Sequence, residues 1–196
     1  MFNPIELGIE FFEGLVAIDE AIVRQAAEAP CPDCGGPLYR SDHARKPRGG
    51  LLAAAGEAFG RRFNLCCGRE GCRHRAMPPS VRFLGRRVYL GAVVIMASAV
   101  ALTRMTVAAA VRAAGVPART LRRWLGWWRG PFTTSAPFIE LCARLIPPPD
   151  RRLLPLSLLE RLAGDGSAPV GKLLAWLAPI TTTSGADASR WLRAAM

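Results

Sequence analysis

The sequence predicts an α+β protein in which a small, metal-bound β region precedes a mainly α-helical region. Two observations lead to this division. Two pairs of cysteines lie in a Gly- and Pro-rich, ionic stretch, and helix-like spacing of apolar residues begins at residue 88. An amphipathic segment precedes both. We therefore expect four parts: an N-terminal helix (1–29), a metal-bound region with a basic arm (30–87), a helical unit (88–130) and a C-terminal helical tail without an assigned role (131–196).

The chain is strongly basic. It has 196 residues and a formal net charge of +11, and its 26 basic residues are all arginines except Lys46 and Lys172. Such an excess indicates a polyanionic partner, nucleic acid in the first place and an anionic membrane surface in the second. The first residues, MFNPIELGIEFFEGL, are acidic and lack the charge order of a signal peptide. We therefore expect a cytoplasmic protein with reduced cysteines.

Residues 3–28 are predicted to form an amphipathic helix. Acidic residues separate apolar ones at helical spacing, namely Ile5, Leu7, Ile9, Phe12, Leu15, Ile18, Ile22 and Val23. Pro30 and the CPDCGG turn end this pattern. The following residues have no helical period, and RRFNLCC is the strand candidate among them.

Four cysteines are predicted to bind one structural Zn²⁺. Cys31 and Cys34 form a C-P-x-C-G turn, and Cys67 and Cys72 form a second turn well downstream. Zn²⁺ prefers four thiolate or imidazole ligands in a tetrahedron, and two local pairs supply them by closing one large loop. Because this region has little apolar material, the metal must supply much of its folding energy. A catalytic zinc would need an open position and a general base, and neither is evident.

The adjacent Cys66 and Cys67 cannot both be ligands, because consecutive side chains of a strand point to opposite faces. Cys67 begins the glycine-bounded turn. We therefore take Cys67 as the ligand and expect Cys66 to be a small core residue. His74 and His43 are alternative ligands, since an imidazole can replace a thiolate.

This arrangement resembles a zinc ribbon, and more narrowly the ribbons near the start of many bacterial insertion-sequence transposases. The matching elements are the CPxCG turn from Cys31, the aromatic-led strand from Phe63 to Cys67, and the C-R-x-R motif from Cys72. The second turn has four residues between its cysteines instead of the usual two, so the chain departs here from the pattern of those families. The resemblance implies a structural zinc beside a DNA-binding region.

Residues 88–103 are predicted to form a buried helix. This stretch has no charged residue, but it is shorter than the roughly 20 residues that a membrane-spanning helix needs. Arg86, Arg87 and Arg104 flank it on both sides and give no inside–outside asymmetry. We therefore expect no membrane span and no membrane partner.

Residues 106–128, TVAAAVRAAGVPARTLRRWLGWW, are predicted to form two helices around a turn at Gly115. Val116 would fill the space between them. The residues expected to pack inward are Ala109, Val111, Ala114, Leu121, Trp124 and Leu125. Four residues of the second helix are expected to face outward: Arg119, Thr120, Arg122 and Arg123. In a helix that lies in the major groove of DNA, residues at such positions contact bases and phosphates.

This segment resembles the helix-turn-helix of bacterial regulators and transposases, in which the sequence pattern "A…GV…TL.RW" is common. Pro117 stands where those families often carry a Ser or Thr helix cap, so the cap's hydrogen bond is lost. The alternative is an ordinary helical hairpin with solvated arginines. Trp127 and Trp128 cannot both face inward, so one of them is available to a partner.

Residues 61–87 form a basic bridge between the two modules. PPSVRFLGRR, at 78–87, looks like an extended arm held by prolines, and such arms contact phosphates without reading sequence. The alternative is a solvated linker. The arginines of this bridge that we expect to contact nucleic acid are Arg73, Arg75, Arg82, Arg86 and Arg87.

The sequence predicts no enzyme and no small-molecule substrate. Cut-and-paste transposases place three carboxylates around Mg²⁺ on a strand-rich core, but after Asp150 the only acids are Glu160, Asp165 and Asp187. No Ser-His-Asp arrangement is present, and AGDGSAPVGK lacks the spacing of a phosphate-binding loop.

We therefore predict a DNA-binding protein that combines a zinc ribbon with a helix-turn-helix, resembling a transposase without its catalytic half. Its expected partners are DNA and either a transposase or a second copy of itself. The alternatives are a transcriptional regulator with the same parts, and a protein-interaction module with a structural zinc.

Overall fold

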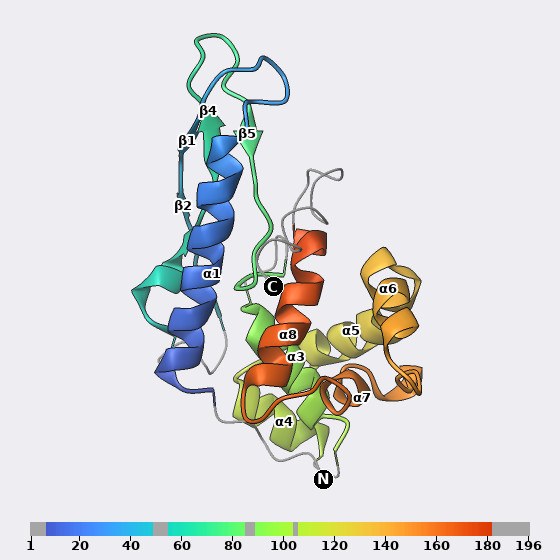
Figure 1. The fold of residues 1–196 in the computed structure, drawn as a ribbon. Helices are drawn as coiled ribbons and strands as arrows, with labels where there is room; N and C mark the ends of the chain where they lie inside the picture. The colour runs from blue at the N-terminus through green and yellow to red at the C-terminus, as the bar shows by residue number, and fades with distance from the viewer. Residues whose placement is uncertain (1–6, 49–54, 85–88, 104–105, 182–196) are drawn as a thin grey trace.

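The computed structural model describes residues 7–48, 55–84, 89–103 and 106–181. The chain is an α+β protein, as predicted, with a long helix beside a small antiparallel sheet and a second half built of shorter helices. In Figure 1 the long helix, α1, runs from the helical half at its N-terminal end to the loops that carry the cysteines at its C-terminal end. These two regions therefore lie at opposite ends of one helix.

Helix α1 (Ile9–Glu28) confirms the predicted amphipathic helix and packs into two separate cores. Phe12 and Leu15, in its first half, belong to the main core of the helical region. Val23 and Ala26, near its end, belong to a smaller core that also contains Cys31 and Cys67. The helix thus connects the metal-binding end of the molecule to the main hydrophobic core.

The three-stranded sheet has the order β1-β4-β5 and is antiparallel throughout, with β1 at Leu38–Arg40, β4 at Leu65–Cys67 and β5 at Arg75–Ala76. Leu38, Leu65 and Cys67 are buried in the smaller core. A second, two-stranded sheet pairs β2 (His43–Ala44) with β3 (Arg61–Arg62), which follows the 3₁₀ helix η1 (Glu57–Gly60). The strand predicted at RRFNLCC is therefore two strands, β3 and β4.

The second half is helical. Its elements are α3 (Gly91–Val100), α4 (Val107–Ala114), α5 (Ala118–Arg129), η2 (Pro131–Thr134), α6 (Ala136–Arg144), η3 (Arg151–Leu153), α7 (Leu156–Leu159), α8 (Ala168–Leu177) and η4 (Ala178–Thr181). Helix α8, which belongs to the segment without an assigned role, contributes Val170, Leu173 and Leu174 to the same core as α3.

Helix α3 is the centre of the main core, and its residues from Gly91 to Ala99 are buried all round. A Cβ atom on Gly91 would lie 2.6 Å from Cδ2 of Leu174, so glycine is what allows α3 to approach α8 this closely. The prediction of a buried apolar helix is confirmed. No helix among the described residues is long and apolar enough to cross a membrane.

The segment predicted to be an exposed basic arm is instead buried where the structure describes it. Residues 78–84 are covered on all sides, and Arg82 is 0 % exposed. Its Nε donates to Oδ2 of Asp19 at 2.8 Å, its Nη1 donates to the carbonyl oxygen of Ala58, and its guanidinium lies 3.9 Å from the ring centroid of Phe63. Arg82 is a core residue and cannot reach a phosphate, so its prediction as a nucleic-acid contact is wrong. Arg86 and Arg87, also predicted as contacts, lie outside the described residues.

Asp19, on α1, is the acceptor that makes this burial possible. Besides Arg82, it accepts hydrogen bonds from the hydroxyl of Ser80 and from the backbone N–H of Val81. The backbone N–H of Ser80 in turn donates to Thr181 in η4. Segment 78–84 therefore joins the long helix to the last described turn of the helical half.

Arg62, on β3, is a second buried arginine of this region. It donates to the backbone carbonyl oxygens of Phe63 and Pro78. Burial lowers the pKa of Arg62 to about 10, and the negative charge of Asp19 acts in the opposite direction. Two of the bridge's arginines thus stabilise the fold and are not available to a partner.

Candidate metal centre and nucleic-acid interface

The first cysteine turn is closed by its own backbone. The N–H of Gly35 donates to the carbonyl oxygen of Cys31, and the N–H of Cys31 donates to that of Gly36, both at 2.8 Å. Gly35 adopts a φ of +70°, a conformation that favours glycine. A Cβ on Gly36 would lie 3.1 Å from Sγ of Cys67 and 3.3 Å from Sγ of Cys34. The two glycines therefore give the turn its shape and leave room for the sulfurs.

The second cysteine turn connects β4 to β5. The N–H of Cys72 donates to the carbonyl oxygen of Arg69, and the N–H of Cys67 donates to that of His74. Gly71 has a φ of +82°, and Arg73 has a φ of +48°, which is uncommon for a residue with a side chain. The longer spacing of this second pair is thus absorbed by two positive-φ residues on either side of Cys72.

The four cysteines predicted to share a metal lie together. Sγ of Cys31 is 3.8 Å from Sγ of Cys72, Sγ of Cys34 is 3.4 Å from Sγ of Cys67, and all four sulfurs lie within 4.8 Å of one another. In a tetrahedral site with metal–sulfur bonds of about 2.3 Å, the sulfurs are separated by about 3.8 Å. A disulfide would instead bring two sulfurs to about 2.05 Å. The group therefore has the donors and the spacing to bind a metal ion.

The environment of the thiols differs from one to the next. The backbone N–H of Gly36, helped by the thiol of Cys72, lowers the pKa of Cys34 to about 7. The N–H of His74 acts to lower the pKa of Cys72, but the thiol of Cys34, burial and the other thiols together raise it to about 12. The lowered pKa favours the thiolate form of Cys34, whereas Cys72 must lose a proton as a metal binds.

The alternative ligands are not part of this group. His74 places its Nδ1 2.6 Å from Oδ2 of Asp33, and His43 hydrogen-bonds to Asn64. Within the described part of the chain, only the four cysteines come together as a metal-binding set of His, Cys, Asp or Glu. Cys66 points away from the set, as predicted, but it is half-buried and does not belong to the core. In the described part of the chain, Tyr39 and Arg75 are exposed on the same face of the sheet as Cys66.

Two further contacts join the cysteine turns to each other. Arg69, in the second turn, donates from Nη1 to the carbonyl oxygen of Cys34 at 2.9 Å. The pair of His74 and Asp33 forms a second bridge. Both are exposed, so they contribute little energy compared with a metal ion that all four thiols share.

Helices α4 and α5 lie on either side of the predicted turn, but the buried residue of α4 is Ala110, which was not predicted, and the predicted inward residues Ala109, Val111, Ala114 and Leu125 are only half-buried. Thr106 caps α4 by accepting from the N–H of Ala109, and Gly115 ends it in the left-handed conformation with a φ of +60°. Val116 is buried between the helices. Pro117 precedes α5 and provides no side-chain cap. The turn is therefore built by Gly115 and Val116, the two residues on which the prediction rests.

Helix α5 has one buried and one basic side. Leu121, Trp124 and Trp128 are buried, and the ring of Trp124 meets that of Tyr89 edge-on with centroids 4.9 Å apart. At 3.6 residues per turn, Arg119, Arg122 and Arg123 project from the opposite side, and Thr120 projects from the flank of the helix. Thr120 is half-buried. The three arginines, Arg119, Arg122 and Arg123, are exposed.

The basic side of α5 has no acidic neighbour in sequence. Between Glu70 and Glu140 the chain contains eleven arginines and no acid. In the part of the chain that the structure describes, no ion pair involves Arg119, Arg122 or Arg123. Their charges are therefore uncompensated and open to an anionic partner.

Arg73 and Arg75, the other predicted contacts, are exposed near the cysteine turns. Figure 1 shows that this end of the molecule is distant from α5, so the exposed arginines form two separate groups. Tyr39, on β1, is a further surface residue that was not predicted as part of a site, and it is 60 % exposed. The sequence signal for its exposure is the alternation of side chains between the two faces of a strand, because the preceding residue, Leu38, is apolar.

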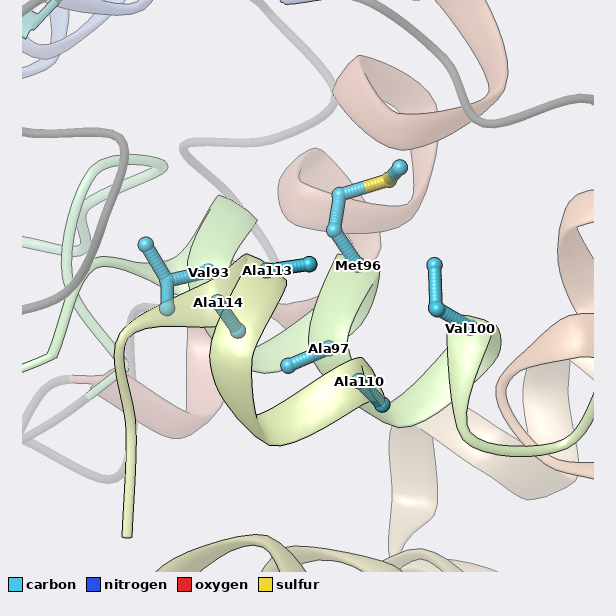
Figure 2. Close-up of a pocket in the computed structure, with 7 residues that line it drawn as sticks. All are labelled: Val93, Met96, Ala97, Val100, Ala110, Ala113 and Ala114. Atoms are coloured by element: carbon cyan, nitrogen blue, oxygen red, sulfur yellow. The ribbon is translucent and has the colours of Figure 1, made fainter. Parts of the chain in front are cut away.

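A small apolar pocket of about 80 Å³ lies between α3 and α4. Figure 2 shows its lining, which consists only of aliphatic side chains and Met96: Val93, Met96, Ala97, Val100, Ala110, Ala113 and Ala114. It offers no polar group to orient a ligand. The small residues of α4 reflect its close crossing with α3.

Comparisons of the chain with models of protein families, with curated proteins and with solved structures give no significant match.

Proposed function

We propose that this protein binds double-stranded DNA through α5, as the recognition helix of a helix-turn-helix, and that a structural Zn²⁺ holds its ribbon-like end together. The observation that carries the proposal is the position of Arg119, Arg122 and Arg123. They are exposed, they form no ion pair with any residue that the structure describes, and they lie opposite the buried tryptophans of the same helix. A helix of this kind fits the major groove with its basic side toward bases and phosphates.

Zinc is the metal that best suits the four cysteines. Thiolate ligands in a tetrahedral arrangement favour Zn²⁺ over the hard cations Mg²⁺ and Ca²⁺, which prefer oxygen ligands. Four thiolates complete the coordination of the ion, so the role we assign to it is structural. Thiols free to bind zinc are typical of a reducing compartment, which supports a cytoplasmic location.

Arg73 and Arg75, at the cysteine end of the molecule, remain predicted nucleic-acid contacts that are separate from those of α5. Transposase-like proteins and transcriptional regulators both use these parts, and we favour the transposase-like reading because of the CPxCG and C-R-x-R motifs around the ribbon.

The test is the binding of labelled duplex DNA by the zinc-loaded protein across a series of salt concentrations. For a protein that neutralises DNA phosphates, the logarithm of the binding constant falls linearly with the logarithm of the salt concentration, with a slope of about −0.9 per phosphate. Replacing Arg119, Arg122 and Arg123 together by Ala should flatten that slope by up to about 2.7. Arg144→Ala is the matched control, because Arg144 is equally exposed but pairs with Glu140 on α6. Failure of the wild-type protein to bind duplex DNA at low salt would refute the proposal.

A further inference from the structure

The face of the three-stranded sheet that points away from α1 carries an ordered row of side chains. In the register of the sheet, Tyr39 on β1 is opposite Cys66 on β4, and Cys66 is opposite Arg75 on β5. Directly paired residues project from the same face. The row is therefore Tyr39, Cys66 and Arg75, with Tyr39 and Arg75 about 10 Å apart at two strand spacings.

The tyrosine ring is exposed and yet held in place. Tyr39 is 60 % exposed, although its ring lies directly on the backbone of Gly68. A Cβ on Gly68 would be 2.2 Å from Cε2 and 2.6 Å from Cδ2 of that ring. Gly68 also donates its N–H to the carbonyl oxygen of Pro37, which ties the two chain segments together beneath the ring. The result is a flat aromatic surface, supported by backbone and open to solvent.

Arginines lie on the same face of the sheet and in the adjoining turn. Arg75 is in the same row, and the neighbouring turn presents Arg69 and Arg73, all three exposed. Of the acids close by in sequence, Asp33 already pairs with His74, which leaves Glu70 as the one opposing charge in the second turn. An aromatic ring among arginines matches the two parts of a nucleotide, a flat base and a charged phosphate.

We propose that this face binds single-stranded nucleic acid, with one unpaired base stacked on Tyr39 and the adjoining phosphates on Arg73 and Arg75. A duplex cannot occupy the ring, because its bases are already stacked on one another; an unpaired base can. The site is separate from α5 and does not depend on the proposed helix-turn-helix. The metal contributes by holding β4 and β5 in the register that places Arg75 beside the tyrosine.

The experiment compares two probes on the full, zinc-loaded chain: a labelled oligothymidylate and a labelled duplex. Tyr39→Ala should weaken binding of the single strand about tenfold, the order of magnitude expected for one stacked base. Tyr39→Phe should bind like the wild type, because the stacking ring remains. Both variants should bind the duplex as the wild type does. The double variant Arg119→Ala/Arg122→Ala should behave in the opposite way: it should bind the duplex more weakly and the single strand as the wild type does.

A second readout is direct. An oligothymidylate that carries 5-iododeoxyuridine should form its photo-crosslink at Tyr39, as mapped by mass spectrometry. Unchanged single-strand affinity of Tyr39→Ala, an equal loss in Tyr39→Phe, or a crosslink confined to α5 would each overturn the inference. None of these results would contradict duplex binding by α5. Conversely, a failure to bind duplex DNA would not contradict single-strand binding at Tyr39. Unchanged thermal unfolding of both tyrosine variants confirms that they fold.

Discussion

Arg82 and Asp19 form an ion pair of 2.8 Å in which both side chains are almost completely buried. The pair joins segment 78–84 to α1, and the remaining acceptor capacity of Asp19 is used by Ser80 and Val81. A buried charge is tolerated only when it is paired and hydrogen-bonded. This contact therefore adds to the attachment of the long helix, whose Phe12 and Leu15 also pack into the main core.

Removing the charge of Asp19 should destabilise the protein strongly. In Asp19→Asn the guanidinium of Arg82 stays buried without its counter-charge, and the free energy of unfolding should fall by about 3–5 kcal/mol. Urea unfolding followed by circular dichroism measures it. The control is the adjacent Glu20→Gln, which breaks the exposed pair with Arg40 and should cost at most about 1 kcal/mol. Similar losses in both variants would mean that the buried pair is not special.

The two adjacent cysteines should differ sharply in their effect on metal content. Cys67→Ser removes one of four sulfurs that lie within 4.8 Å of one another, so the purified variant should hold much less zinc and unfold at lower temperature. Cys66→Ser alters a half-buried thiol on the other face of the strand and should keep about one zinc per chain, the stoichiometry of a tetrahedral site. Elemental analysis of both variants is the measurement. Equal zinc in the two proteins would contradict the assignment of Cys67.

The arginines of α5 should distinguish sequences. Residues on the outer side of a major-groove helix contact base edges as well as phosphates. We therefore expect Arg119→Ala and Arg122→Ala to weaken binding to a selected DNA site by about tenfold more than binding to random DNA, since one good base contact discriminates by about 1–3 kcal/mol. Selection of sites from a random duplex library, followed by competition binding, tests this. An equal loss on both DNAs would show that these arginines contact phosphates alone.

Glycine-to-alanine substitutions in helices should have opposite signs at different positions. Gly14 in α1 and Gly126 in α5 are exposed, and an added Cβ at either would meet no atom within 4 Å. Alanine there should raise the free energy of unfolding by about 0.5–1 kcal/mol, because glycine loses more backbone entropy on folding.

Gly91→Ala is the contrasting variant. Its Cβ would lie 2.6 Å from Cδ2 of Leu174, which is itself fully buried, so the leucine side chain would have to shift within the core. Overpacking of this kind should cost about 1–3 kcal/mol. Thermal unfolding of the three variants side by side measures the difference, and a stabilised Gly91→Ala would show that the contact between α3 and α8 is loose.

Several parts of the fold follow from short-range sequence patterns. The cysteine turns were predicted from glycines beside cysteines, and the structure brings together the four residues chosen. Helices α4 and α5 lie on either side of the turn predicted at Gly115. Each of these features depends on residues a few positions apart, whose conformations are restricted by sterics and by helical periodicity.

Other features depend on partners far apart in sequence. Arg82 and Arg122 are the same side chain in similarly basic stretches, yet the first is buried against an aspartate 63 residues earlier and the second is exposed. Asp19 itself looks like one more acid on the polar side of an amphipathic helix. Nothing near these residues in sequence reveals the pairing, because burial of a charge is favourable only where the fold brings its counter-charge and its hydrogen bonds to the same place. Local pattern thus specified the turns, the helices and the choice of metal ligands, whereas long-range packing selected which arginines hold the fold together and which remain open to a partner.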